Sequence, residues 1–329
     1  MSLSFDFIFR LLIFPGFIFI FTLSMLCDWM ERKIKARMQN RMGPTYTGPI
    51  GILQPMADLI KLLAKEDIVP YGTKSLLYKA APLISFSIFM LTLLIIPIDG
   101  AEIIPGFSFE GDLVLVLAMM VIANFFLFFA GWASSNPLST IGSARILTQL
   151  IGYDIPMFIL ALTPAFLARS LSISAIANAQ KIPFILLMPW SFIIFVITLQ
   201  AELEKDPFDI PHAETEIVAG YETEYTGRRL AFLKMSKDLQ MLLGAALITE
   251  LFLGGANGPL ITVGFSSLWK TLWFTLKVLL IVVLMVYLTC VFARLRIDQV
   301  VVFNWKTLLP LSLISLVASV ILKLFMVGG

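Results

Sequence analysis

Long runs of apolar residues restrict what this sequence can fold into. A helix needs about 20 mainly apolar residues to cross the roughly 30 Å hydrocarbon core of a bilayer. Backbone groups in that core must be paired within the spanning element, so helices of this length are the expected solution. Apolar residues make up 59% of the 329 residues, and the mean hydropathy is +0.92. The sequence therefore predicts an all-α integral membrane protein.

Eight apolar segments predict about eight transmembrane helices. They lie at about residues 5–30, 80–98, 112–133, 144–168, 183–203, 232–254, 268–292 and 306–327. An even number of spans places both termini on one side, and the loops richest in Lys and Arg are expected to be cytoplasmic. We therefore predict a multi-pass protein of the cell (inner) membrane, with both termini on the outer side and the large loops cytoplasmic.

The domain organisation follows from the same segments. Residues 1–329 are expected to form a single polytopic membrane domain, with a cytoplasmic loop at about residues 31–79 and an acidic cytoplasmic loop at about 202–231. The first of these loops contains the amphipathic segment ILQPMADLIKLLAKE. Asp58 and Lys61 fall on or near its polar face, opposite an apolar face formed by Ile52, Leu53, Met56, Leu59, Ile60 and Leu63. This pattern predicts a helix in the membrane interface, either passive or able to dock a partner.

Ionisable residues inside predicted spans require an explanation, because a charge near the bilayer centre costs about 2.5–3.5 kcal/mol on insertion scales. Asp154 lies well inside the span that starts near residue 144. We predict a proton relay at Asp154; the alternative is a carboxyl bonded to backbone groups freed by Pro156. Glu250 and Lys277 are expected either to pair or to lie near the outer interface.

The acidic loop places eight carboxylates in the 23 positions from Glu202 to Glu224. Pro207 and Pro211 predict a broken segment in place of a continuous helix. Its aromatic and aliphatic residues predict partial burial, and crowded carboxylates in a poorly solvated place share protons. His212, the only histidine, is either structural or a further titrating group. The spacing of a calcium-binding loop is absent, so no metal site is predicted.

Residues that could carry a redox centre are scarce. Cys27 and Cys290 stand singly inside predicted spans, without a CxxC partner. One histidine cannot supply two axial haem ligands. Any redox centre that this chain serves is therefore expected in another chain.

Four stretches resemble a known family: the ERK of residues 31–33, RMGPTYTGPIGILQPMADLIKLLAKED, PFDIPHAETEIVAGYETEYTG and RLRIDQVVVFNWKTLLPLSL. In this order they resemble the H (first core) membrane subunit of proton-pumping NADH:quinone oxidoreductase, respiratory complex I. The resemblance implies a subunit that joins an iron-sulfur hydrophilic arm to the antiporter-like membrane arm. It also implies a quinone cavity at the junction and a relay of buried carboxylates, with no covalently bound cofactor.

The resemblance assigns roles to particular residues. The relay is expected at Asp154, Glu202, Asp209, Glu214, Glu216 and Glu224, to which we add the titratable His212. The quinone cavity or arm-docking surface is expected at Glu31, Arg32, Arg37, Arg41, Arg294, Arg296 and Asp298, with Asp58, Lys61 and Arg228 beside it. The implied partners are iron-sulfur subunits on the cytoplasmic side, small and antiporter-like membrane subunits, and lipid, without nucleic acid.

The sequence departs from the family pattern at three places. Asp154 and His212 stand where the family usually has Glu, and Lys205-Asp206 replaces an Arg-Ala type pair. Homologous anchor subunits also serve ferredoxin-driven membrane-bound hydrogenases and sulfur reductases, which pump H⁺ or Na⁺ without quinone. That alternative stays open at this point, whereas a stand-alone secondary transporter is disfavoured because internal repeats are not found.

Overall fold

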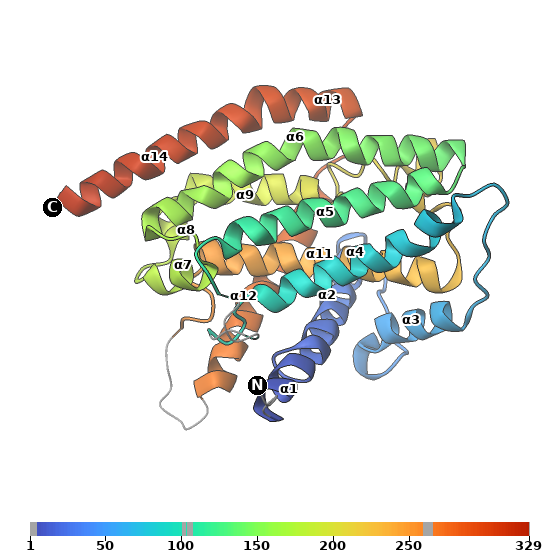
Figure 1. Cartoon of the computed structure of the whole chain (residues 1–329), viewed down its shortest axis with the longest axis horizontal. Helices are drawn as coiled ribbons and strands as arrows, with labels where there is room; N and C mark the ends of the chain where they lie inside the picture. Colours follow the sequence, from blue (N-terminus) through green and yellow to red (C-terminus); the bar gives the residue numbers. More distant parts are fainter. Residues whose placement is uncertain (1–4, 101–102, 104–107, 259–265, 329) are drawn as a thin grey trace.

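The computed structural model describes residues 5–100, 103, 108–258 and 266–328 (Figure 1). Within these ranges the regular structure is helical and no strand is present, which confirms the all-α class. The α-helices are α1 Phe5–Leu12, α2 Phe17–Met38, α3 Gln54–Ala64, α4 Ser75–Ile95, α5 Asp112–Ala133, α6 Pro137–Ala168, α7 Ile173–Ala179, α8 Phe184–Leu187, α9 Pro189–Glu202, α10 Glu214–Ile217, α11 Gly227–Phe252, α12 Ser266–Val291, α13 Ile297–Phe303 and α14 Leu309–Gly328. Short turns of other helix types are η1 Pro49–Gly51, η2 Gly220–Glu222 and the π-helical η3 Asn304–Leu308.

In the described part of the chain, six helical segments are long and apolar enough to cross a membrane. They contain α2, α4, α5, α6, α12 and α14. The other two predicted spans coincide with α9, which has 14 residues, and with α11, which carries several charged side chains. The membrane class is thereby confirmed, and the count of eight spans stays a prediction.

The first predicted span, residues 5–30, coincides with the candidate spanning segment Phe7–Met38, but the helix is interrupted and ends later than predicted. The chain breaks between α1 and α2 at Pro15 and Gly16, because proline has no N–H to donate and restricts the helix before it. α2 then continues to Met38. Its last turns contain strong helix formers and the i,i+4 pairs Asp28–Arg32 and Glu31–Lys35. Glu31, Arg32 and Arg37 therefore lie on a helix and not in a loop.

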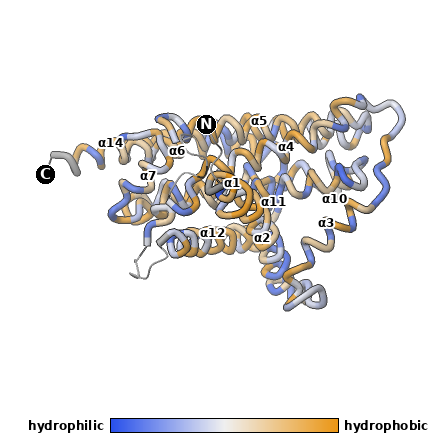
Figure 2. Tube along the Cα trace, turned by 60° about the horizontal axis from the view of Figure 1, so that its bottom comes forward, coloured by the Kyte–Doolittle hydropathy of each residue, from blue (hydrophilic) through white to orange (hydrophobic). Residues whose placement is uncertain are grey.

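The long helices pack side by side around one apolar core (Figure 1). α4 packs against α5 and α11, and α6 packs against α5, α9 and α14. α12 lies against α2 and α11, and both α2 and α12 are inclined to the main direction of the bundle. Apolar residues dominate the bundle helices, and hydrophilic residues gather in the connecting loops (Figure 2).

We call the bundle end that carries the loops at residues 39–74 and 203–226 the acidic end. These two loops meet there, where the backbone N–H of Ile68 donates to Thr226 Oγ1 at 3.2 Å. α3 lies at this end, outside the main bundle, and contacts α2 and α11 (Figure 1). Met56, Ile60 and Leu63 on its apolar face are exposed by 42%, 55% and 43%. The amphipathic helix is therefore present, with an apolar side that the rest of the chain does not cover.

Close glycine contacts insert part of the acidic loop between α5 and α6. Gly220 has a φ of +56°. A β-carbon added at Gly142 of α6 would lie 3.0 Å from the α-carbon of Gly220. On the α5 side, a β-carbon at Gly131 would lie 2.6 Å from the β-carbon of Tyr221. Tyr221 is fully buried as a result. This part of the loop is thus held inside the bundle.

Candidate functional site

Glu202 is the last residue of α9 and is fully buried. Nδ2 of Asn124 on α5 donates to its Oε1 at 2.7 Å, and Nε2 of Gln240 on α11 donates to its carbonyl oxygen at 2.9 Å. The same Gln240 nitrogen lies 3.0 Å from Oδ1 of Asn124, so the two amides hold each other in place. Oε2 of Glu202 has no hydrogen-bond partner among the described residues. This oxygen can accept a proton without breaking an existing contact.

Asp154 on α6 is 7% exposed and interacts electrostatically with Glu202. Its neighbour Tyr153 reaches the same polar cluster, because Nδ2 of Asn124 lies 3.4 Å from the Tyr153 hydroxyl oxygen. Oδ1 of Asp154 is buried, and no described group donates to it, including backbone freed by Pro156. The structure therefore brings two predicted relay residues into one carboxylate pair, which we call the Asp154–Glu202 pair.

Glu204, two residues after Glu202, is a second buried carboxylate. It is 5% exposed and has a φ of +50°, which turns its side chain away from the direction of α9. Nζ of Lys237 lies 2.9 Å from its carboxylate and Nε2 of His212 lies 3.2 Å from it. Lys237 also donates to Oε1 of Gln240 at 3.3 Å. Lys237 and Gln240 thereby connect Glu204 with Glu202.

The pKa values of the loop residues follow from this geometry. Burial raises the pKa of Glu204, but Lys237 and His212 outweigh this effect and lower the pKa to about 2. Burial lowers the pKa of His212, yet its hydrogen bond to Glu204 and the charge of Glu222 raise it overall above 6.5. Asp209 lacks such a partner, and burial raises its pKa to about 6. The pKa values of the crowded acids are therefore shifted in different directions, in contrast to a uniformly proton-sharing cluster.

A charged groove of about 370 Å³ lies on the other side of the same loop. Glu31 of α2 is held there by Nζ of Lys205 at 2.5 Å and by Nζ of Lys35 at 2.7 Å. Arg32 pairs with Asp28 at 2.7 Å and also with Asp58 of α3. We call this cavity the charged groove; its lining is Asp28, Glu31, Arg32, Lys35, Ala36, Arg41, Met42, Gly43, Pro44, Lys205 and Asp238.

Four consecutive residues join the groove to the carboxylate pair. Glu202 points into the bundle, Glu204 pairs with Lys237, and Lys205 pairs with Glu31 in the groove. The backbone N–H groups of Leu203, Glu204 and Lys205 donate to carbonyl oxygens in the last turn of α9. This short segment, residues 202–205, is therefore fixed to the end of α9.

Three arginines gather at a smaller cavity of about 320 Å³ at the acidic end. Arg145 lies 2.6 Å and Arg294 lies 3.6 Å from the Glu216 carboxylate, while Arg296 lies 3.8 Å from Asp298. The Glu216 side chain is 51% exposed, and its hydrogen bond from Arg145 lowers its pKa. The predicted residues Glu216, Arg294, Arg296 and Asp298 thus meet in a surface ion-pair cluster.

The remaining predicted residues do not join either cavity. Arg37, Lys61 and Arg228 are exposed at the acidic end. Glu224 accepts a hydrogen bond from Asn136, and its carbonyl oxygen accepts from the Tyr78 hydroxyl at 2.7 Å. The side chain of Glu214 lies outside the described part of the structure.

Several residues of the site were not predicted. They include Asn124, Glu204, Lys205, Lys237 and Asp238. Lys237 and Asp238 could have been predicted in the same way as Asp154, because both are ionisable residues inside a predicted span, here residues 232–254. Asn124 is a polar residue in an otherwise apolar span, which is a weaker signal of the same kind.

Glu250 and Lys277 lie near the opposite end and form no ion pair within 4.0 Å in the described residues. Glu250 is 1% exposed. Nζ of Lys277 donates instead to the carbonyl oxygens of Leu253, Gly255 and Asn257 at 2.6–2.8 Å. Lys277 therefore caps the C-terminal end of α11.

Metal-binding side chains are not grouped in the part of the chain that the structure covers. Among these residues, no three His, Cys, Asp or Glu side chains are placed to hold a metal ion.

The fold and the site together define a polytopic helical membrane protein in which a buried carboxylate pair adjoins a charged groove at one end of the bundle.

Comparison with known sequences names the family. A sequence profile described as NADH dehydrogenase matches residues 11–320, and the chain belongs to this family. It is 38% identical to the H subunit of the NADH-quinone oxidoreductase of Dehalococcoides mccartyi (strain CBDB1) over 308 residues, which cover 93% of this chain and 84% of the relative. It is 36% identical to the corresponding protein of Thermomicrobium roseum over 321 residues, covering 92% of each chain. The corresponding protein of Geobacillus kaustophilus is 38% identical over 300 residues, covering 89% of this chain and 87% of the relative.

Proposed function

We propose that this chain is the membrane-anchor and ion-coupling subunit of a complex I-like respiratory oxidoreductase in the cell membrane. The observation that carries the proposal is the segment 202–205, which connects the charged groove with the Asp154–Glu202 pair. A change of charge in the groove acts on Lys205 and Glu31, and the same backbone segment holds Glu202. The proposal gives the chain no redox centre of its own and assigns the iron-sulfur clusters to partner subunits.

The charged groove is the proposed place of the quinone headgroup. Its volume falls in the range of about 300–1,000 Å³ that is usual for small-molecule pockets. Lys35, Lys205 and Arg41 offer N–H donors to carbonyl oxygens, and Asp238 lines the same cavity. A bound quinone supplies the acceptor for electrons. The names of the relatives support a quinone-linked assembly over the quinone-free alternative.

The relay role is assigned to the buried acids next to the groove. Asp154 and Glu202 each keep one oxygen without a hydrogen-bond donor among the described residues, so each can bind and release a proton. Gln240, Lys237 and Glu204 extend the polar path towards His212. Protons taken up near the groove would pass along this path into the membrane arm, where the small and antiporter-like subunits lie.

The acidic end is the proposed docking surface for the hydrophilic arm on the cytoplasmic side. It presents the arginine cluster around Glu216 and the exposed Arg37, Lys61 and Arg228. The uncovered apolar face of α3 lies at the same end and would sit in the membrane interface. No nucleic-acid partner is part of the proposal.

The relay is tested by Asp154→Asn and Glu202→Gln in the assembled complex, reconstituted in vesicles. Each amide keeps the size of the side chain but cannot bind a proton in the working pH range. We expect redox-driven proton uptake to fall at least about tenfold, since a positioned proton-transfer group typically contributes about 10²–10⁴-fold. The measurement is the response of a pH-sensitive dye inside the vesicles after addition of the electron donor.

Glu66→Gln is the matched control, because Glu66 is an exposed carboxylate outside both cavities. It should assemble and pump as the wild type does. Normal subunit composition of all variants, checked by gel filtration, separates a relay defect from an assembly defect. Wild-type pumping in both relay variants would refute the role of the pair.

A further inference from the structure

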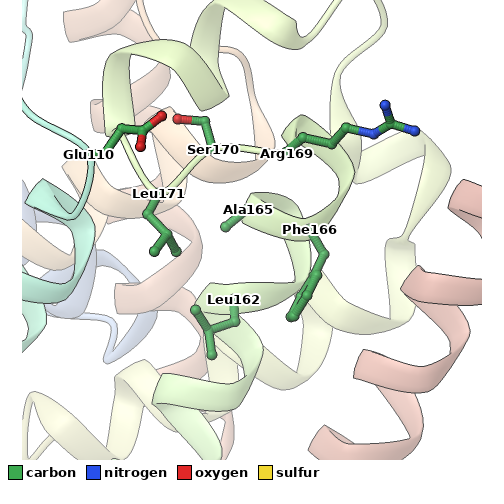
Figure 3. A pocket seen from close by; sticks show the side chains of 7 residues that line it. All are labelled: Glu110, Leu162, Ala165, Phe166, Arg169, Ser170 and Leu171. Carbon is green, nitrogen blue, oxygen red and sulfur yellow. The ribbon is translucent and has the colours of Figure 1, made fainter.

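A pocket of about 490 Å³ lies at the end of the bundle opposite the charged groove. It is formed by the end of α6, the residues that follow it and Glu110, which precedes α5. Figure 3 shows Glu110, Ser170 and Arg169 along one edge and Leu162, Ala165, Phe166 and Leu171 below them. The pocket is therefore amphipathic, with a polar edge at the helix ends and an apolar wall beneath.

The polar edge carries one exposed anion and one exposed cation that are not paired. Among the described residues, neither Glu110 nor Arg169 forms an ion pair. In Figure 3 Glu110 and Ser170 lie towards one end of the polar edge, and the Arg169 guanidinium extends away from them at the other end. Ser170 Oγ accepts a hydrogen bond from the backbone N–H of Ser172 at 3.1 Å, which leaves its hydroxyl hydrogen free to donate.

The apolar wall runs from this edge along the surface of α6. From Arg169 to Leu162 the helix descends about two turns, or about 10 Å, towards the middle of the bundle. Phe166 is 48% exposed and Leu171 is 39% exposed, so the wall is accessible from the side. A long apolar chain can therefore lie against α6 while a polar headgroup stays at the helix end.

We propose that this pocket binds a phospholipid with a zwitterionic headgroup that ends in a primary ammonium. The phosphate pairs with Arg169, the ammonium donates to Glu110, and an acyl chain lies on Leu162 and Phe166. Charge complementarity selects this class of lipid. An anionic headgroup without an amine would leave Glu110 unpaired beside a negative ligand, and a quaternary ammonium has no N–H to donate.

The test uses the complete complex in nanodiscs. The probe is a phosphatidylethanolamine with a photoreactive diazirine in its acyl chain, and the crosslinked peptide is identified by mass spectrometry. We expect crosslinks at residues 162–171, displaced by unlabelled phosphatidylethanolamine more strongly than by phosphatidylcholine or phosphatidylglycerol. The inference does not depend on the proposed coupling function, because crosslinking requires no turnover.

Variants separate the two headgroup contacts. Glu110→Gln should weaken crosslinking of the ethanolamine probe by about two- to five-fold, the range for an exposed ion pair. It should not weaken crosslinking of an anionic glycerol-headgroup probe, because the variant removes a like charge. Arg169→Asn, which suits the left-handed backbone at this position, should weaken both probes. Lys181→Asn, an exposed cation at the same end but outside the pocket, is the control and should change neither.

Two results would overturn the proposal. Equal displacement by all three unlabelled lipids would show that the pocket does not recognise the amine. Absence of crosslinks at residues 162–171 would show that a protein neighbour covers the pocket in the complex. Equal melting temperatures of variants and wild type exclude misfolding as the cause of a lost crosslink.

Discussion

At the residue scale, the ion pairs of Glu204 show how one buried carboxylate can keep a low pKa while the pKa of another near it is raised. Burial alone would favour its protonated form, but Lys237 at 2.9 Å and His212 at 3.2 Å reverse this preference. Asp209 has no comparable partner and keeps a raised pKa of about 6. The loop thus contains acids that titrate in different pH ranges.

The pairing of His212 with Glu204 predicts a pH-dependent stability. The pKa of His212 is raised above 6.5 in the folded chain, so its contribution is fully present below pH 6.5 and is lost as the pH rises through the folded value. The pKa of Glu204 is lowered to about 2, so its contribution is present above pH 4.5 and is lost only towards pH 2. His212→Gln should therefore lower the melting temperature more at pH 5.5 than at pH 8.5.

The measurement is thermal unfolding of the purified protein in detergent at both pH values. Lys65→Gln, which removes an exposed cation, should show no such pH dependence. A loss of stability in His212→Gln that is the same at pH 5.5 and pH 8.5, or larger at pH 8.5, would contradict the charged pairing.

Some site residues could be predicted from sequence and others could not, for physical reasons. Asp154 stood out because the cost of a carboxylate in an apolar span is a local property. The choice of partner is not local: Asn124 and Gln240 reach Glu202 only because α5 and α11 pack beside α9. Likewise, the sequence shows three lysines in or near the loop, Lys205, Lys234 and Lys237, but only the fold pairs Lys237 with Glu204 and Lys205 with Glu31.

At the element scale, the position of the acidic loop depends on the close approach of η2 to α6. Six of the eight predicted spans coincide with helices that are long and apolar enough to cross a membrane, because apolar length alone defines them. The insertion of the loop was not predicted, because it depends on glycines on different elements. A β-carbon added at Gly142 would lie 3.0 Å from the α-carbon of Gly220, which is tighter than most contacts of real side chains.

Gly142→Ala tests this contact. The added β-carbon would lie 3.0 Å from the backbone of Gly220 and Tyr221, so the loop must shift. Overpacking typically costs about 1–3 kcal/mol, and the gain of about 1 kcal/mol from replacing glycine in a helix offsets part of it. We expect a lower melting temperature and reduced proton pumping. Ile141→Ala, at a neighbouring site that is 47% exposed, should have a much smaller effect; equal effects would argue against the tight contact.

At the scale of the whole molecule, the two ends of the bundle differ in chemistry. One end has the charged groove, the arginine cluster and α3, and the other has the amphipathic pocket beside Arg169. The proposed function requires the first end to face the cytoplasm.

Cysteine labelling tests this orientation. In a background with Cys27 and Cys290 replaced by serine, Glu66→Cys and Lys181→Cys place single exposed thiols at opposite ends. A membrane-impermeant maleimide should label Lys181→Cys in intact cells stripped of their outer layers, and Glu66→Cys only in inside-out vesicles. The opposite pattern would reverse the proposed topology, and labelling of both on one side would contradict the predicted alternation of spans.

The short connection from Glu202 to Lys205 has a thermodynamic consequence. If a ligand in the charged groove changes the proton affinity of the Asp154–Glu202 pair, then the number of protons on the pair must change the affinity of that ligand by the same factor. Binding in the groove would then depend on the proton content of the bundle, and each tenfold effect would represent about 1.4 kcal/mol shared between the two events. Under the proposed function, the proton content of the Asp154–Glu202 pair would thereby change the affinity of the groove for quinone.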